Sequence, residues 1–349
     1  MKARIELTGR ENNLNLLRFV AALLVIFSHA YVLTGNGADP ITRATRGQTT
    51  GGQLAVLLFF FYGGLLIMKS LERRKTARAF FEARVLRIFP ALWIVVLGSV
   101  FLLGPALTAL PMKAYLLNGG TWKYLLNGLL IPVHDLPGVF ENNPAMATVN
   151  GALWTLPVEF CCDVICFAFC RLGLADGKKP LILLPVAVAV AYAARALLGR
   201  YEVLQNAVLP VLFFYIGMVC CVYRDSIPLN GWAALAAAAL LIVSVIAGVF
   251  PYALCVLYPY ILLYLGFGTP KKLSGFGRKL ELSYAIYLTG FPIQQTLLHF
   301  VPGMSPMANC AAASCVAIII AVPVTLLDRR LSSRLRGRKE PEKNRREAA

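Results

Sequence analysis

The sequence predicts an all-α integral membrane protein whose chain crosses a bilayer about ten times. Only 15% of its 349 residues are charged and 58% are hydrophobic, whereas about 25% of the residues in a soluble globular domain are charged. The mean hydropathy is +0.67. Apolar stretches recur as far as residue 327, and no long polar block separates them. We therefore expect one polytopic membrane domain over 1–327, followed by a basic, disordered tail over 328–349.

The first apolar stretch, 14–34, is expected to be a permanent span. No small-residue cleavage site follows its apolar run, and Arg18 and His29 interrupt that run, so a removable signal peptide is disfavoured. Nine further spans are expected, with approximate bounds 53–68, 88–105, 151–170, 180–199, 204–223, 230–249, 252–268, 281–300 and 307–327.

Residues 111–133 are apolar, but Pro and Gly interrupt them, which predicts a re-entrant or interfacial segment and not an eleventh span. The distribution of basic residues favours the same interpretation. With ten crossings, the basic stretch KSLERRKTARAFFEARVLR and the basic tail fall on one side of the membrane, as the positive-inside rule requires. We expect that side to be the cytoplasm, with both termini there, and the membrane to be a bacterial inner membrane. Arg224, Lys271, Lys272, Arg278, Lys279 and the N-terminal Lys2, Arg4 and Arg10 fall on the same side.

The formal net charge of +17 does not indicate a nucleic-acid partner, because the basic residues gather at one membrane face. We expect membrane lipids as partners instead. Arg43, Arg46, Lys113 and Lys123 fall on the outer side, either as solvated charges or as contacts for an acidic acceptor or lipid headgroups.

The nine cysteines lie in apolar stretches, and no Cys-x-x-Cys pair or matching histidine cluster accompanies them. They are interpreted as small packing residues. No metal site is predicted.

Arg18 and His29 are the first candidates for chemistry. They are eleven residues apart in one apolar span, so they share a helix face about 16 Å apart in depth. Ionisable groups inside a membrane helix are costly and usually mark a functional cavity. A neutral imidazole suits proton transfer near neutral pH. The alternative for His29 is a hydrogen bond between helices.

Arg84 and Arg87 are neighbours on a helix face in the run RVLRIFPALW. Paired guanidinium groups suit phosphate oxygens, because they offer forked, charge-assisted hydrogen bonds. The alternative is plain anchoring of the span at a membrane face.

Glu159 lies in the run LWTLPVEF, at a depth comparable with that of His29. A carboxylate beside an imidazole fixes its tautomer and stabilises the imidazolium. The alternative is a structural partner for Arg18 or another buried cation, and Asp163, one turn further on, is a weaker candidate for the same role.

The runs NLNLLRFVAALLVIFSHA, LLFFFYGGLLI, RVLRIFPALW, LWTLPVEF and LSYAIYL, in this order, resemble the membrane-bound acyltransferase 3 family over about residues 14 to 300. The resemblance implies about ten spans and the transfer of acyl groups, mostly acetyl, from cytoplasmic acyl-CoA to extracytoplasmic sugars. It implies that Arg18 and His29 form the transfer site, that Arg84 and Arg87 determine acyl-CoA use, and that Glu159 is the acidic position of its tryptophan motif.

Two positions depart from the family pattern. Gly63-Gly64 stands where relatives often have Ser-Gly, and Gly290 stands where they often have a histidine. Longer relatives also carry a C-terminal hydrolase-like domain, and we expect the membrane domain here to act alone or with partners.

Together with the resemblance, these residues predict an O-acyltransferase that moves an acyl group from cytoplasmic acyl-CoA to a surface or exported glycan, or to a lipid-linked saccharide. The expected donor is acetyl-CoA, with succinyl transfer as the alternative. His29, oriented by Glu159, is expected to deprotonate the acceptor hydroxyl or to carry the acyl group itself, and Arg18 to steady the donor arm or the developing charge. The rival interpretations are a transporter or flippase, in which intramembrane Arg, His and Glu are equally natural, and a glycan polymerase.

Overall fold

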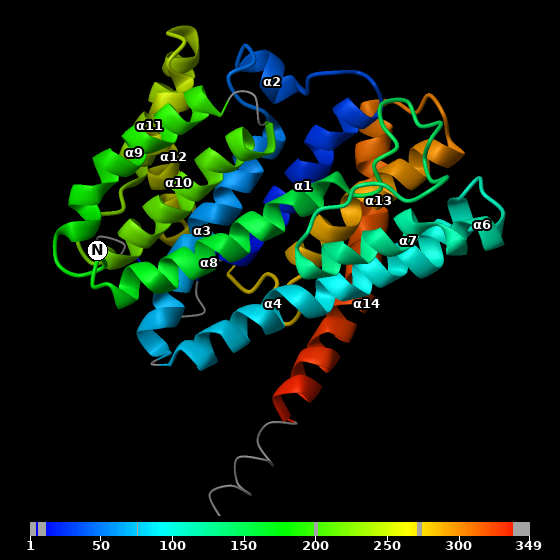
Figure 1. Cartoon of the computed structure of the whole chain (residues 1–349). Coiled ribbons are helices and arrows are strands. Elements are labelled where there is room, and N and C mark those ends of the chain that lie inside the picture. The colour runs from blue at the N-terminus through cyan, green and yellow to red at the C-terminus, as the bar shows by residue number, and fades with distance from the viewer. Residues whose placement is uncertain (1–4, 6–11, 75, 199–201, 271–273, 338–349) are drawn as a thin grey trace, which may run out of the picture.

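The protein is a bundle of antiparallel helices (Figure 1). The computed structural model describes residue 5 and residues 12–74, 76–198, 202–270 and 274–337. No β-strand occurs among these residues. Lys2, Arg4, Arg10, Lys271 and Lys272, which entered the predicted charge bias, lie outside them.

Within the described residues, eight helical stretches are long and apolar enough to cross a membrane. They are α1 (Leu14–Leu33), α3 (Gly51–Arg73), α4 (Ala77–Gly98, continued by η1, Ser99–Leu103, and α5, Gly104–Leu107), η3 with α8 (Gly151–Trp154 and Thr155–Arg171), α9 (Lys179–Leu197), α10 (Glu202–Val222), α12 with η4 (Phe250–Leu263 and Tyr264–Gly268) and α14 (Pro306–Gly337). Two more helices complete the predicted set: α11 (Gly231–Ile246) and α13 (Ser283–Phe300). The predicted polytopic all-α fold is confirmed.

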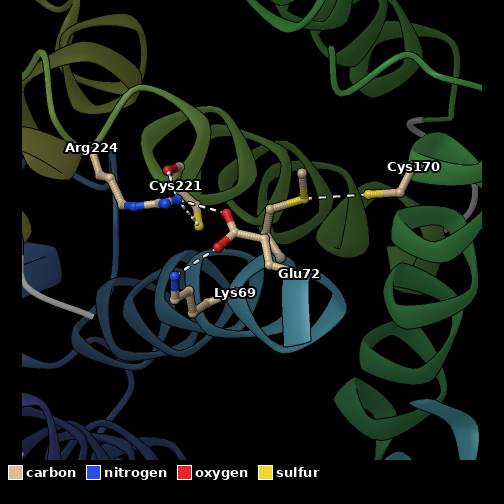
Figure 2. Close-up of polar contacts among 6 residues, drawn as sticks. Lys69, Glu72, Cys170, Cys221 and Arg224 are labelled. Atoms are coloured by element: carbon tan, nitrogen blue, oxygen red, sulfur yellow. Dashed lines mark hydrogen bonds and ion pairs between the residues drawn. The ribbon is translucent and has the colours of Figure 1, made fainter. Parts of the chain in front are cut away.

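Contacts at one end of the bundle show how the helices alternate in direction. Figure 2 shows Glu72, in the last turn of α3, between Lys69 of its own helix and Arg224 just after α10. The Glu72 carboxylate lies 2.7 Å from Lys69 Nζ and 2.6 Å from Arg224 Nη1. The thiol of Cys170, near the end of α8, donates to Met68 Sδ of α3 at 3.4 Å. We call this the basic end, because several arginines gather here: Arg73, Arg74, Arg171, Arg224, Arg329 and Arg336.

The opposite end, which we call the loop end, holds the longer connections. Gln48 donates to the carbonyl oxygen of Val245 and accepts from the backbone N–H of Phe250, so residues 34–50 contact the α11–α12 turn. This connection includes the short helix α2 (Pro40–Ala44).

Residues 108–150 also remain at the loop end and do not cross the bundle. They contain three short helical pieces, α6 (Met112–Leu117), α7 (Gly119–Lys123) and η2 (Tyr124–Leu129), which lie beside the end of α4 (Figure 1). The chain then returns to α13, where Asn143 donates to the carbonyl oxygen of Gln295. The structure thus agrees with the prediction that 111–133 is not a full span.

Two helices are longer than the sequence predicted. α4 begins at Ala77, eleven positions before the expected start near Ile88, because Thr76 caps it by accepting from the backbone N–H of Ala79. Pro90 lies inside this helix and does not end it. α14 continues to Gly337, so the first ten residues of the tail expected to be disordered are helical; residues 338–349 lie outside the described part.

Glycines allow α3 and α10 to pack closely against each other. A Cβ atom on Gly64 would lie 1.9 Å from the carbonyl oxygen of Phe214, and one on Gly217 would lie 2.1 Å from that of Phe61. Gly63 differs, since a Cβ there would lie 3.5 Å from the Phe214 ring, an ordinary contact. A serine at 63, as relatives often have, therefore fits this backbone.

Gly290 explains the second departure from the family pattern. It lies on α13 against α1, and a Cβ atom there would lie 2.8 Å from Cγ1 of Ile26. A histidine at this position would force the Ile26 side chain, or the contact between α1 and α13, to shift.

Candidate active site

Three cavities follow one another from the basic end to the loop end. The first, of about 620 Å³, lies between α4 and the end of α14, and we call it the basic vestibule. The second, of about 190 Å³, lies among α1, α3, α4, α8, α10 and α13 and is the central cavity. The third, of about 620 Å³, contains His29 and is the histidine cavity. The basic vestibule and the central cavity share the lining residues Arg84 and Arg87. The central cavity and the histidine cavity share Val56 and Tyr287.

The basic vestibule is strongly cationic. Five arginines and one carboxylate line it, from the residue after α3, from α4 and from α14: Arg74, Arg84, Arg87, Arg329, Arg336 and Asp328. Arginine binds phosphate oxygens in a forked geometry, so this lining suits a ligand with several phosphates.

Pro90 places Arg84 and Arg87 by linking α4 to its neighbours. Proline lacks the N–H that would bond to the carbonyl four residues earlier. That carbonyl, of Leu86, accepts instead from the Ser332 hydroxyl of α14 at 3.1 Å. The carbonyl of Ile88 accepts from the Tyr284 hydroxyl of α13 at 2.9 Å. Arg84 and Arg87 lie directly before Pro90, in the part of α4 that these two hydrogen bonds hold against α13 and α14.

Arg87 is held by groups that the sequence analysis did not select. Its Nη2 lies 3.4 Å from Oε2 of Glu281, which precedes α13. Its Cζ lies 5.3 Å from the centroid of the Tyr284 ring, a cation–π geometry. Glu281 also interacts electrostatically with Arg18, so one carboxylate serves two arginines.

The central cavity is less cationic than the vestibule. Arg18, Arg84, Arg87 and Glu159 line it. Glu281 contributes a second carboxylate, and Asp163 interacts electrostatically with Arg84. Three arginines therefore face two close carboxylates, Glu159 and Glu281, so the central cavity carries less excess positive charge than the vestibule and suits an uncharged polar ligand better than a phosphate.

His29 lies in a different environment. Its ring packs edge to face on Phe291 of α13, with centroids 5.2 Å apart, and it lines the histidine cavity. Among the described residues it has no hydrogen-bond partner, so the alternative of an interhelical hydrogen bond is not what the structure contains.

Asp39 holds the wall of the histidine cavity in place. This buried carboxylate accepts from the Ser28 hydroxyl at 2.6 Å, from the Thr42 N–H at 2.8 Å and from the Gly51 N–H at 3.2 Å. Burial acts to raise its pKa, but the three hydrogen bonds outweigh burial, and the pKa is lowered from its usual value. The loop before α3 is thereby fixed to the residue next to His29.

Tyr287 and Val56 mark the boundary between the central and histidine cavities. The Tyr287 hydroxyl lies 2.8 Å from the carbonyl oxygen of Ala152 and 2.6 Å from the Thr155 hydroxyl. Its ring packs against Phe59 at 5.8 Å.

The structure brings together only part of the predicted site. Arg18, Arg84, Arg87 and Glu159 share the central cavity, whereas His29 lies beyond Tyr287. The expected contact between Glu159 and His29 is absent. Thr155, at the start of α8, contacts Tyr287 at the boundary between the central and histidine cavities. Glu159 lies one helical turn further from that boundary, toward the basic end. The alternative role of Glu159, as a partner for buried cations, agrees with its electrostatic interactions with Arg18, Arg84 and Arg87.

Glu281 had a signal in the sequence, since it is the single carboxylate in the basic connection KKLSGFGRKLELSY. Tyr287 belongs to the run LSYAIYL that the resemblance used. No local pattern pointed to the vestibule, which requires the end of α14 to lie beside α4.

Comparison with known proteins decides the family. A model described as an acyltransferase domain matches residues 11–326. The chain belongs to the acyltransferase 3 family. This acyltransferase is 26% identical over 329 residues to the O-acetyl transferase of Shigella phage Sf6, a match that covers 84% of this chain and 90% of that protein. It is 32% identical over 161 residues to nodulation protein 10 of Rhizobium leguminosarum bv. viciae, which covers 44% and 42% of the two chains.

No solved structure matches this acyltransferase significantly. Its family and its apolar helices together make it a multi-pass membrane acyltransferase.

Proposed function

We propose that this protein transfers an acetyl group from acetyl-CoA to a hydroxyl group of a cell-surface or exported glycan. The observation that carries the proposal is the series of shared linings that joins a five-arginine vestibule to a cavity containing one histidine. The similarity to a phage O-acetyl transferase supports the choice of acetyl and of an oxygen acceptor.

The donor is proposed to enter at the basic end. Its phosphates bind Arg84 and Arg87 together with the vestibule residues Arg329 and Arg336, since these groups supply forked donors and excess positive charge. The uncharged pantetheine arm fits the central cavity, whose arginines are partly neutralised by Glu159 and Glu281, and Arg18 and Glu159 contact the arm there. Its thioester then lies near Tyr287, at the boundary with the histidine cavity.

The acceptor is proposed to enter the histidine cavity from the loop end. His29 accepts the proton of the acceptor hydroxyl while the hydroxyl oxygen forms a bond to the carbonyl carbon of the thioester. The carbon–sulfur bond then breaks, and the proton returns to the departing thiolate. A second route, in which His29 carries the acetyl group between donor and acceptor, uses the same residue.

The basic end is proposed to face the cytoplasm of a bacterium, with the loop end outside the inner membrane. The arginines of the basic end support this orientation under the positive-inside rule, and it places the donor entrance in the compartment that contains acyl-CoA. Both termini are then cytoplasmic.

The test uses purified protein in lipid nanodiscs with radiolabelled acetyl-CoA and extracted bacterial glycans. Label should appear in the glycan with the wild type and disappear with His29→Ala. The matched control is His299→Ala, because His299 packs against Phe140 and Phe300 and lines none of the three cavities. Equal transfer by His29→Ala would overturn the role of His29.

The rival interpretations give different outcomes in the same preparation. A transporter or flippase would move a saccharide across a vesicle membrane without labelling it. A polymerase would lengthen the glycan without using acetyl-CoA.

A further inference from the structure

An apolar groove on the flank of the bundle has no role in the proposed reaction. It lies between α9, α10 and α12 and has a volume of about 330 Å³. Aliphatic and aromatic side chains line it, among them Leu184, Val188, Tyr192, Tyr252 and Val256. α9 is the candidate span with the smallest buried share, so this flank faces the surrounding lipid.

The groove continues the face of α9 that reaches the histidine cavity. Leu184, Val188, Tyr192 and Arg195 are spaced by four, four and three residues, which places them on one helix face. Arg195 lines the histidine cavity, and the other three line the groove. Arg195 also interacts electrostatically with Tyr192 and Cys255, both of which line the groove. The guanidinium therefore lies where the two spaces meet.

The position of Arg195 matches the depth of a lipid phosphate. It is two residues from the loop end of α9, or about 3 Å along the helix axis. His29 is four residues from the same end of α1, or about 6 Å. From Tyr192 to Leu184 the groove then descends about 12 Å into the bilayer. A cation beside a polar cavity, with an apolar groove below it, complements a phosphate that joins a sugar to a hydrocarbon chain.

We propose that this groove binds the hydrocarbon chain of a lipid-linked saccharide, with the phosphate at Arg195 and the sugar in the histidine cavity. Among the cavities lined by described residues, this groove is the one that meets the histidine cavity at Arg195, so we assign it an occupant with one long chain. The assignment of the sugar end rests on the proposed function. The binding of the chain and of the phosphate does not.

The binding test uses a photoreactive prenyl phosphate with a diazirine in its chain, incorporated with the protein into phosphatidylcholine nanodiscs. Crosslinks should map to peptides of α9, α10 and α12. Unlabelled prenyl phosphate should displace the probe, whereas prenol, which has no phosphate, and phosphatidic acid, which has two chains, should not. In Arg195→Gln, the concentration of unlabelled prenyl phosphate that displaces half of the probe should rise about tenfold, which corresponds to about 1.4 kcal/mol of binding free energy.

Two tryptophan variants of α9 form a matched pair. Val188→Trp fills the groove and should abolish the crosslinks, whereas Val190→Trp lies outside the groove, 60% exposed, and should leave them unchanged. Val256→Trp closes the groove from α12 and replaces Val188→Trp if that variant does not fold. Equal displacement by phosphatidic acid would show an ordinary bilayer lipid site and overturn the proposal, as would crosslinks that persist in the groove variants.

A transfer assay separates this proposal from the previous one. Val188→Trp should lower acetylation of a lipid-linked glycan and leave acetylation of the same glycan, released from its lipid, unchanged. A wild type that acetylates neither glycan but crosslinks as described would refute the proposed function and leave the groove assignment standing.

Discussion

The Tyr287 hydroxyl donates to the carbonyl oxygen of Ala152 at 2.8 Å, and this contact joins α13 to η3, just before α8, between the central and histidine cavities. The ring of Tyr287 therefore separates a space lined by arginines from a space that contains His29. In the proposed reaction this ring also limits the water that reaches the thioester from the acceptor side.

Removing that ring should make the donor sensitive to water. We expect Tyr287→Ala to raise the release of CoA from acetyl-CoA without acceptor by about tenfold, because water from the histidine cavity can then reach the thioester. A thiol reagent measures the release. Tyr287→Phe keeps the ring and should stay near the wild-type rate. A Tyr287→Ala rate equal to that of the wild type would show that the boundary lies elsewhere.

Arg87 should influence the donor more than the acceptor. We expect Arg87→Ala to raise KM for acetyl-CoA by at least about tenfold, because a charge-assisted hydrogen bond contributes about 1.5–3 kcal/mol, and to change kcat less. The KM of Arg87→Lys for acetyl-CoA should lie between those of the wild type and Arg87→Ala, since lysine keeps the positive charge but cannot form the two parallel hydrogen bonds of a guanidinium group.

The control for Arg87 is Arg78→Ala on the same helix. The Arg78 side chain is 80% exposed, pairs with Glu82 and lines none of the three cavities. If both variants raised KM equally, a general effect of positive charge would explain the result.

The two glycines at 63 and 64 should differ sharply in tolerance. Gly64→Ala places a Cβ atom 1.9 Å from the carbonyl oxygen of Phe214, so α3 and α10 must separate, at a cost of about 1–3 kcal/mol. Gly63→Ala makes an ordinary contact at 3.5 Å and should unfold near the wild-type temperature. Thermal unfolding in one detergent measures both. A Gly64→Ala protein as stable as the wild type would contradict this packing.

Asp39 should give a pH-dependent contribution to stability. Its pKa is below the usual 3.8 in the folded protein, so the contribution is complete above pH 3.8 and is lost as the pH falls through the folded value. In Asp39→Asn, either amide orientation places an NH₂ group against a backbone N–H, which should cost about 2 kcal/mol at pH 7.

Unfolding of the wild type and of Asp39→Asn across pH measures this effect. The difference between them should shrink only below pH 3.8, where the wild-type carboxyl also becomes protonated. A difference that stays constant through that range would show that the charge of Asp39 is not what its hydrogen bonds stabilise.

The spans were predictable because hydropathy and the placement of basic residues are local properties that can be read directly from the sequence. The broken segment 111–133 was predictable for the same reason, from its Pro and Gly interruptions. The start of α4 was not, since a basic stretch capped by Thr76 extends the helix past the point where its hydropathy begins.

The candidate site was only partly predictable. The number of residues between a side chain and the end of its helix does not show how deep that helix end lies in the bundle, or which neighbouring helices the side chain faces. Counting from Gly151 placed Glu159 level with His29, but η3 enters the bundle before α8 begins, and Tyr287 lies between the two residues. Glu281 is far from Arg87 in sequence, and only the packing of α13 against α4 brings them together.

The length of α14 has a consequence for where this protein can be cut. Hydropathy ends near residue 327, yet Arg329, Ser332 and Arg336 follow on the same unbroken helix and form one side of the vestibule. A truncation at that hydropathic boundary would keep the apolar part of every candidate span and remove the α14 side of the vestibule, where the proposed donor enters. Such a shortened protein should insert into the membrane and fold, but bind the proposed donor weakly.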